Sequence, residues 1–310
     1  MWPGFGLLLT SAVMLVAGAE LFTENAGQAA RKLGITVFGI AFLLAGAEPE
    51  EMITAIIASA RHRPGLAVGD AIGANLTMLT LVLGLAALAR PLPFGGRVRS
   101  YAIWSAAAGG LAAFAVAGGH VGRWEGGLLL AAYVAGVAAL WWREREPPAI
   151  GELAEAGDDD DERSRPPAAG LAIAVAGVAL MAAGGWLAVA GASRVVSALG
   201  LTDTAVGLTL LALATTAELL ALAWAAMRRG VSEIAVAGVA GSAAYNATAT
   251  VGAAALVRPL AAGGILGPAI AAAALPLVLL AVTARGRLSR PAGAVLVAAY
   301  ITWATLTLAR

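Results

Sequence analysis

The sequence of 310 residues contains no cysteine and only two histidines, His62 and His120. The lack of thiols excludes disulfide bonds, thiolate zinc sites, iron–sulfur clusters and a cysteine nucleophile. Two histidines are too few for most histidine-based metal or catalytic centres. No His-Glu-x-x-His or Gly-x-Ser-x-Gly motif occurs, and the nearest match to an intramembrane aspartyl-protease motif, residues 67–70, lacks its first glycine and a Tyr-Asp partner. We therefore expect a protein that is not an enzyme.

Charge is also scarce, because only 13% of the residues are charged while 60% are hydrophobic. A typical soluble domain is about a quarter charged. The net charge of +1 leaves no global basic field that would attract nucleic acid. The N-terminal segment has neither a basic n-region nor a clear cleavage site, so we expect it to be the first membrane span. The composition predicts an all-α membrane protein with several spans.

Apolar stretches long enough to cross a bilayer, about 20 residues each, fall into two groups of five. Many of them are rich in Ala and Gly, which favours close helix–helix contact in lipid. Ten transmembrane helices are therefore expected, at about 4–23, 34–60, 66–89, 100–119, 124–142, 168–192, 203–227, 232–257, 265–284 and 291–309.

A polar segment separates the two groups and divides the chain into residues 1–142, 143–167 and 168–310. Its acidic run, 158–162, is typical of a solvated, disordered linker. The run lacks the alternating ligands and the glycine of an EF-hand loop, which argues against the alternative of a regulatory cation site.

The basic residues predict the orientation of the chain. Fourteen of the 20 Lys and Arg residues fall in the loops that follow odd-numbered helices, the linker included. Cytoplasmic loops carry the excess of Lys and Arg, so the linker should be cytoplasmic and both termini should lie outside. We expect the inner (plasma) membrane of a prokaryote.

The two halves resemble each other at an offset of 168 residues. Glu50 then meets Glu218, Gly84 meets Gly252, and 88–92 meets 256–260, including a shared Arg-Pro pair. Because each half has an odd number of helices, the second must enter the membrane from the opposite side. Such inverted five-helix repeats are the architecture of many secondary transporters, with the substrate site near the midplane on broken helices.

Glu50 and Glu218 lie well inside the second and seventh expected helices. A charge at the bilayer centre costs about 2.5–3.5 kcal/mol on insertion scales, so each carboxylate should face the bundle interior or water. Since the repeat relates the two residues by a pseudo-twofold axis, they should converge. We predict one shared cation site with Glu50 and Glu218 as its metal ligands.

Both helices should be broken beside these glutamates. Pro49 cannot donate a backbone hydrogen bond, which frees carbonyl groups near Gly46 and Ala47. In the second half the proline is absent, and hydroxyl groups can either bond the freed carbonyls or bind an ion; the residues concerned are Ala214, Thr215 and Thr216. Two carboxylates with carbonyl and hydroxyl oxygens suit Ca²⁺, which takes six to eight oxygen ligands.

The third and eighth helices should complete the site. Ser242 and Asn246 are four residues apart and share a helix face, whereas the equivalent Ala74 and Met78 offer no strong oxygen ligand. Side chains that could assist the ion, or form ordinary helix–helix hydrogen bonds in the case of the Asn and Thr residues, are Glu48, Glu51, Asp70, Asn75, Thr77 and Thr216. Asp70 is expected in an outer vestibule.

At these residues the chain resembles the Ca²⁺/cation antiporter superfamily, which includes the sodium/calcium exchangers. The resemblance rests on Gly46 to Glu50, on 66–75 and on 81–85, which are similar to the family's G-T-S-x-P-E and G-S-N-x-x-N/D motifs and their continuation. It implies an antiporter that moves Ca²⁺ in exchange for Na⁺ or H⁺ by alternating access. It implies no cofactor, the lipid bilayer and inorganic cations as partners, no nucleic acid and no obligate protein partner.

The sequence departs from the family pattern where neutral sodium ligands would be. The Thr-Ser pair is replaced by Gly46 and Ala47 in the first half and by Ala214 and Thr215 in the second. The proton-coupled branch of the superfamily needs only titratable carboxylates, so an H⁺-coupled exchanger of another divalent cation is an alternative. A cation channel or sensor on the same fold is another.

The predicted topology is testable by labelling. Single cysteines placed at Asp159 and at the N-terminus should react with impermeant maleimides from opposite sides of an intact cell, because the linker and the termini lie on opposite faces. The natural lack of cysteine gives an unreactive background. Labelling of both positions from one side would contradict the ten-helix count.

Overall fold

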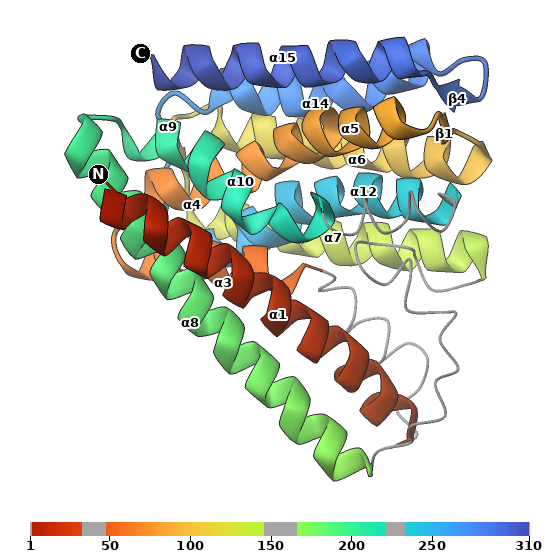
Figure 1. The fold of residues 1–310 in the computed structure, drawn as a ribbon. Helices are drawn as coiled ribbons and strands as arrows, with labels where there is room; N and C mark the ends of the chain where they lie inside the picture. The colour runs from red at the N-terminus through yellow and green to blue at the C-terminus, as the bar shows by residue number, and fades with distance from the viewer. Residues whose placement is uncertain (1, 33–47, 146–165, 221–232, 310) are drawn as a thin grey trace.

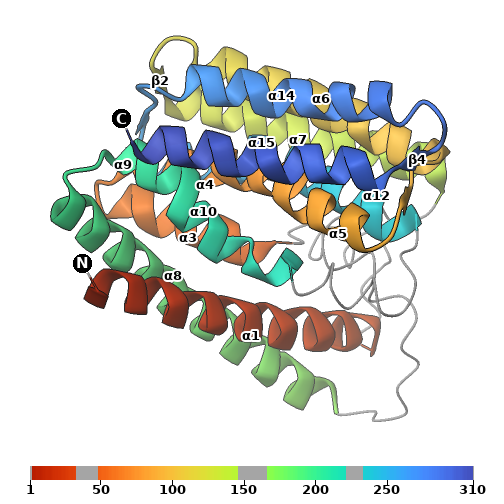
Figure 2. The ribbon, with the colours of Figure 1, turned by 45° about the horizontal axis from the view of Figure 1, so that its top comes forward.

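A computed structural model describes residues 2–32, 48–145, 166–220 and 233–309, and these residues are mostly helical (Figures 1 and 2). In the first half the elements are α1 (Trp2–Lys32), α3 (Pro49–Ala60), α4 (Pro64–Leu76), η1 (Thr77–Val82), α5 (Leu83–Ala89), β1 (Leu92–Pro93), α6 (Gly96–Val116), β2 (His120–Val121) and α7 (Arg123–Glu144). Those labelled η are π-helical.

In the second half the elements are α8 (Pro167–Leu199), α9 (Asp203–Val206), η3 (Gly207–Leu211), α10 (Ala212–Thr215), α12 (Glu233–Tyr245), η4 (Asn246–Thr250), α13 (Val251–Val257), β3 (Leu260–Ala261), α14 (Leu266–Val282), β4 (Arg287–Leu288) and α15 (Arg290–Leu308). The segments η1 and η4 follow α4 and α12 directly, so the π geometry occurs at equivalent places in the two halves. Such π segments often mark functional sites.

Five of the described helices are long and apolar enough to cross a membrane: Trp2–Asn25, Pro64–Ala89, Arg123–Glu144, Ala168–Leu199 and Arg290–Leu308. Shorter apolar helices cover Asp203–Thr215 and Leu266–Val282. The expected ten-helix count remains a prediction, because parts of the second, seventh and eighth expected spans lie outside the described residues.

The paired helices α1 and α8 are longer than their expected spans. They contain 31 and 33 residues, which at about 1.5 Å per residue exceeds the roughly 30 Å hydrocarbon core. Figures 1 and 2 show the two helices side by side and inclined to the rest of the bundle. Such a tilt allows a long apolar helix to match the bilayer thickness.

Contacts between the halves come in equivalent pairs. Strand β1 pairs antiparallel with β4, and β2 pairs antiparallel with β3. At an offset of about 168 residues, β1 of the first half corresponds to β3 of the second, and β2 corresponds to β4. The two strand pairs are therefore equivalent to each other. Figure 2 shows β2 and β4 at opposite ends of the bundle.

Close contacts at glycines also occur at equivalent places in the two halves. A Cβ atom added to Gly84 would lie 2.9 Å from the carbonyl oxygen of Gly293, and one added to Gly252 would lie 2.7 Å from that of Gly126. The first contact joins α5 to α15 and the second joins α13 to α7. In both, the lack of a side chain lets the two backbones approach closely.

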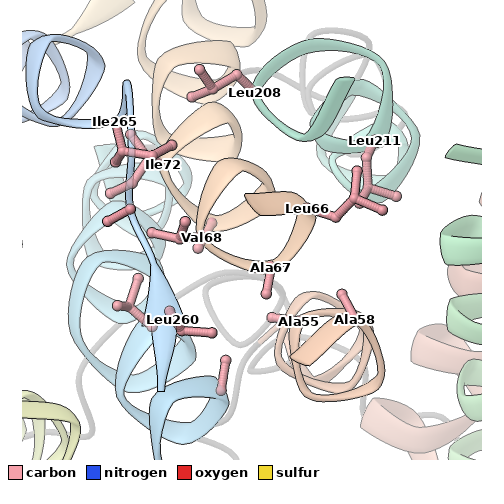
Figure 3. Close-up of a cluster of buried hydrophobic side chains, with 14 of the residues drawn as sticks. Ala55, Ala58, Leu66, Ala67, Val68, Ile72, Leu208, Leu211, Leu260 and Ile265 are labelled. Atoms are coloured by element: carbon pink, nitrogen blue, oxygen red, sulfur yellow. The ribbon is translucent and has the colours of Figure 1, made fainter. Parts of the chain in front are cut away.

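Helix α4 lies at the centre of the molecule. Residues 65–76 are buried along their whole length. Figure 3 shows Leu66, Ala67 and Val68 of α4 between α3 on one side and residues of the second half on the other. The residues that surround them include Ala55, Ala58, Leu208, Leu211, Leu260 and Ile265. This core positions Asp70 and Asn75 of α4 against the second half.

The α7–α13 contact predicts that adjacent glycines differ in their tolerance of alanine. A Cβ at Gly126 would lie 2.8 Å from that of Ala255, whereas one at Gly127 would meet nothing within 4 Å. Gly126→Ala should destabilise the protein by about 1–3 kcal/mol through overpacking, seen as a lower thermal unfolding temperature in detergent. Gly127→Ala is the matched control and should be neutral or slightly stabilising. Equal effects would contradict the packing.

Candidate cation-binding site

The N-terminus of α3 brings three glutamates into the protein interior. Pro49 occupies the first helical position, where a missing N–H costs nothing. Glu48, Glu50 and Glu51 surround it and are only 1%, 3% and 1% exposed. The helix dipole favours acids in this first turn, and Glu48 is the N-cap residue, although its side chain does not make the capping hydrogen bond. The predicted carbonyl ligands of Gly46 and Ala47 lie outside the described residues.

Asp70 of α4 contacts Thr215 of α10 across the interface between the halves. The Thr215 hydroxyl lies 3.1 Å from Asp70 Oδ1 and within 3.3 Å of the Leu211 and Ala212 carbonyl oxygens. Since a hydroxyl donates only one hydrogen at a time, its lone pairs remain available to a cation. The other oxygen of Asp70, Oδ2, is buried with no hydrogen-bond partner among the described residues.

Asn246 links the second half to Glu48. Its Nδ2 donates to Glu48 Oε2 at 3.2 Å, and its Oδ1 accepts from the Thr250 hydroxyl at 3.0 Å. The amide therefore presents its donor to the glutamates, while its oxygen is bonded to Thr250. An amide oxygen has two lone pairs, so Oδ1 can still bind a cation through the second one, as the sequence predicts.

Glu51 lies between charged and polar neighbours. Glu48 and Asp70 are within electrostatic range of it, and the Asn246 side chain is close by. Both of its carboxylate oxygens are buried and lack a hydrogen-bond partner among the described residues.

Glu218 follows an interruption in its helix. Helix α10 ends at Thr215, Thr216 has φ −79° and ψ 5°, and helical geometry resumes at 217–220. The Thr216 hydroxyl donates a hydrogen bond to the Ala212 carbonyl oxygen at 2.7 Å, so it bonds a backbone carbonyl group beside the break. Glu218 is 3% exposed, and neither of its carboxylate oxygens has a hydrogen-bond partner among the described residues. Ala214 is buried beside this break.

The predicted ligands of the third and eighth helices have different environments. Ser242 is fully buried, and its hydroxyl has no partner among the described residues. Asn75 donates to the Ala243 carbonyl at 2.8 Å, and Thr77 donates to the Gly73 carbonyl at 2.9 Å and lies 3.3 Å from the Tyr300 hydroxyl. Asn75 and Thr77 therefore make one helix–helix bond and one intrahelical bond, while Asn75 Oδ1 is buried with no hydrogen-bond partner among the described residues.

Two polar residues near the site were missed by the sequence reasoning. Tyr245 is buried with its hydroxyl unbonded among the described residues, within electrostatic range of Glu50, Glu48 and Glu51. Its ring makes an edge contact with Tyr133 at 5.3 Å between centroids. Thr250 fixes the Asn246 amide. The only signal for Thr250 was its position one turn after Asn246 on the same helix face.

The carboxylates are not arranged as a finished metal site. Within the part of the chain that the structure describes, no three His, Asp or Glu side chains lie close enough together to hold a metal ion. Instead, Glu48 and Asp70 bond polar side chains of the other half, and Glu51 interacts electrostatically with both acids.

Comparison with known proteins identifies the family. The model of the sodium/calcium exchanger protein family matches residues 3–142 and 169–309, which is most of the chain, in two segments that correspond to the two halves. The chain belongs to the sodium/calcium exchanger family. It is a multi-pass integral membrane protein of a transporter family and not an enzyme.

Individual relatives are similar over shorter stretches. The sodium/calcium exchanger MaX1 of Methanosarcina acetivorans is 33% identical over 90 residues, 28% of this chain and 26% of the relative. The inner membrane protein YrbG of Escherichia coli is 38% identical over 88 residues, 28% of this chain and 26% of the relative. The chain thus spans only about a quarter of the length of these curated relatives in each match.

The fold is similar to that of solved exchangers over its whole length. A structure of the sodium–calcium exchanger NCX_Mj superposes with a TM-score of 0.63 and 24% identity, covering 96% of this chain and 97% of that one.

The Glu48–Asn246 contact predicts the effect of exchanging charge between its partners. Asn246→Asp should place a second carboxylate against Glu48 and lower stability by about 1–3 kcal/mol in the absence of divalent cations. Adding Glu48→Gln to that variant supplies a new donor and should restore most of the loss. Thermal unfolding in detergent measures both. A double variant no more stable than Asn246→Asp would show that the two side chains do not interact.

Proposed function

We propose that this protein is a secondary-active antiporter that moves Ca²⁺ across the membrane in exchange for Na⁺ or H⁺. The observation that carries the proposal is the burial of five carboxylates, Glu48, Glu50, Glu51, Asp70 and Glu218, inside an apolar helix bundle. Intramembrane carboxylates are costly and mark ion pathways. Family membership and the exchangers named among its relatives favour the same activity.

The proposed architecture has ten transmembrane helices in two inverted repeats. The equivalent strand pairs β1–β4 and β2–β3, at opposite ends of the bundle, support this relation. Asn75 supports it further, because the carbonyl it bonds belongs to Ala243, its own equivalent at the 168-residue offset. A residue contacts its own equivalent only near a twofold axis.

We place both termini outside the cell and the 143–167 linker in the cytoplasm. Figures 1 and 2 support a common side for the termini, since α1 begins and α15 ends at the same end of the bundle. The excess of basic residues on the other side sets the orientation. The membrane is then the inner membrane of a prokaryote, in line with the description of YrbG.

The transported ion binds between the halves in this proposal. Glu50 and Glu218 are its two charged ligands, one from each repeat. Neutral oxygens come from Thr215 and Ser242, from Asn246 Oδ1, and from the carbonyl groups of Gly46, Ala47 and Ala214. Such a set of hard oxygen ligands meets the demand of Ca²⁺ for six to eight oxygens.

We choose the counter-ion from a difference between the two halves, which do not supply the same number of oxygen ligands. Ala74 and Met78 are fully buried and offer no oxygen where Ser242 and Asn246 do. Sodium sites that need those oxygens are therefore incomplete, while Glu48, Glu51 and Asp70 supply additional carboxylates. We infer that exchange depends more on H⁺ than on Na⁺.

Flux measurements in proteoliposomes test the proposal. ⁴⁵Ca²⁺ uptake should require an outwardly directed gradient of the counter-ion, and an imposed H⁺ gradient should drive it more strongly than an imposed Na⁺ gradient. Glu50→Gln and Glu218→Gln should each reduce uptake by at least about tenfold, because each removes a charged ligand. Glu125→Gln, a change of the same kind at the start of α7, is the control and should transport normally.

Each alternative predicts a different result. Wild-type exchange in the Glu50 or Glu218 variant would contradict the site. Uptake that follows the Ca²⁺ gradient without any counter-ion would indicate a channel. Steep, cooperative Na⁺ dependence at constant pH would overturn the preference for H⁺.

A further inference from the structure

Three of the five buried carboxylates have no counterpart in the second half. At the 168-residue offset Glu48, Glu51 and Asp70 correspond to Thr216, Leu219 and Gly238. A symmetric site made by Glu50 and Glu218 does not require them. They nevertheless lie within electrostatic range of one another around Glu51, so they need an explanation of their own.

The charges of Glu51 and Asp70 are not balanced by basic side chains. The ion pairs among the described residues are Arg63–Asp203 and Arg97–Glu144, each at 3.0 Å, and neither includes a carboxylate of the site. Both oxygens of Glu51 and Oδ2 of Asp70 are buried and unbonded within the described parts of the chain. A buried carboxylate that lacks a partner is strongly unfavourable unless a cation or a proton neutralises it.

Tyr245 is a further buried polar group near these acids that lacks a hydrogen-bond partner among the described residues. Its hydroxyl is on a side chain that is 1% exposed and has no hydrogen-bond partner among the described residues. Three glutamates, Glu50, Glu48 and Glu51, lie within its electrostatic range. A buried phenol usually finds a partner, yet none of these carboxylates accepts a hydrogen bond from it. The unmade bond is expected if a cation or its bound water lies between them.

We propose that Glu51 and Asp70 bind a second divalent cation, in addition to the ion at Glu50 and Glu218. Asp70 Oδ2 and the two Glu51 oxygens are its charged ligands, and the Thr215 hydroxyl, 3.1 Å from Asp70 Oδ1, is a neutral ligand that it shares with the first position. Glu48 stays bonded to Asn246 and acts through its charge. The proposal rests on the proposed function only in taking the Glu50–Glu218 position as the first ion site.

Hard oxygen ligands of this kind favour Ca²⁺ or a similar ion over softer metals. The two positions would be adjacent, since Glu50 and Glu51 are consecutive and Thr215 lies three residues before Glu218. The charged ligands of the second ion, Glu51 and Asp70, both come from the first half of the chain, on α3 and α4. The ion at Glu50 and Glu218 instead takes one charged ligand from each repeat.

Equilibrium binding of ⁴⁵Ca²⁺ to the purified full chain in detergent tests the second position without any transport. The wild type should bind about two Ca²⁺ per chain, and Glu51→Gln or Asp70→Asn should each reduce the number to about one. Glu50→Gln should also leave about one, held at the second position. Glu125→Gln controls for the general loss of a carboxylate and should retain two, and thermal unfolding establishes that every variant is folded.

The outcomes separate the two proposals. About one Ca²⁺ in the wild type, lost in Glu50→Gln and retained in Glu51→Gln and Asp70→Asn, would overturn the second position and leave the first intact. One Ca²⁺ that is lost in Glu51→Gln but retained in Glu50→Gln would overturn the Glu50–Glu218 assignment instead. Unchanged binding of two ions in Glu51→Gln and Asp70→Asn would also overturn the second position, and no binding by the folded wild type would contradict both.

Discussion

Burying several carboxylates in an apolar helix bundle is the constraint on which the rest of this structure depends. A charge inside a membrane is tolerated only when polar groups, water or ions compensate it. Here that compensation comes from the opposite half of the molecule: Asn246 donates to Glu48, and Thr215 contacts Asp70. The interface between the halves is therefore both a packing surface and the place where ions can be neutralised.

The packing around this interface keeps it narrow. Small residues allow the backbones of α5 and α15, and of α7 and α13, to come within contact distance. Alanine and leucine side chains surround α4 and exclude solvent from its length. In so tight an environment a hydroxyl or an amide has few alternative partners, which explains why the polar side chains bond either the acids or nearby carbonyl groups.

The sequence predicted the general plan because that plan is encoded in features visible without coordinates. The apolar stretches predicted the helical membrane protein, and the shared Glu50 and Glu218 predicted two buried carboxylates. Helix lengths were underestimated for α1 and α8, since hydropathy measures the thickness of the apolar layer and not the tilt of a helix.

Other features depend on tertiary contacts that periodicity does not report. The direction of the Asn246 amide is set by Thr250 and Glu48 together. The π segments η1 and η4 arise from backbone geometry for which the sequence showed no proline or glycine signal. Glu48 and Asp70 were assigned accessory roles from the sequence, yet they are the acids that bond Asn246 and Thr215 across the interface.

The most direct test of the account is a crystal structure of the protein soaked with Sr²⁺, a heavier analogue of Ca²⁺, with the ion located by its anomalous scattering. The account predicts a strong anomalous peak inside the bundle, coordinated by carboxylate oxygens of both Glu50 and Glu218. An ion bound elsewhere with none at Glu50 and Glu218, or Glu50 and Glu218 held too far apart to share one ion in the soaked crystal, would contradict it.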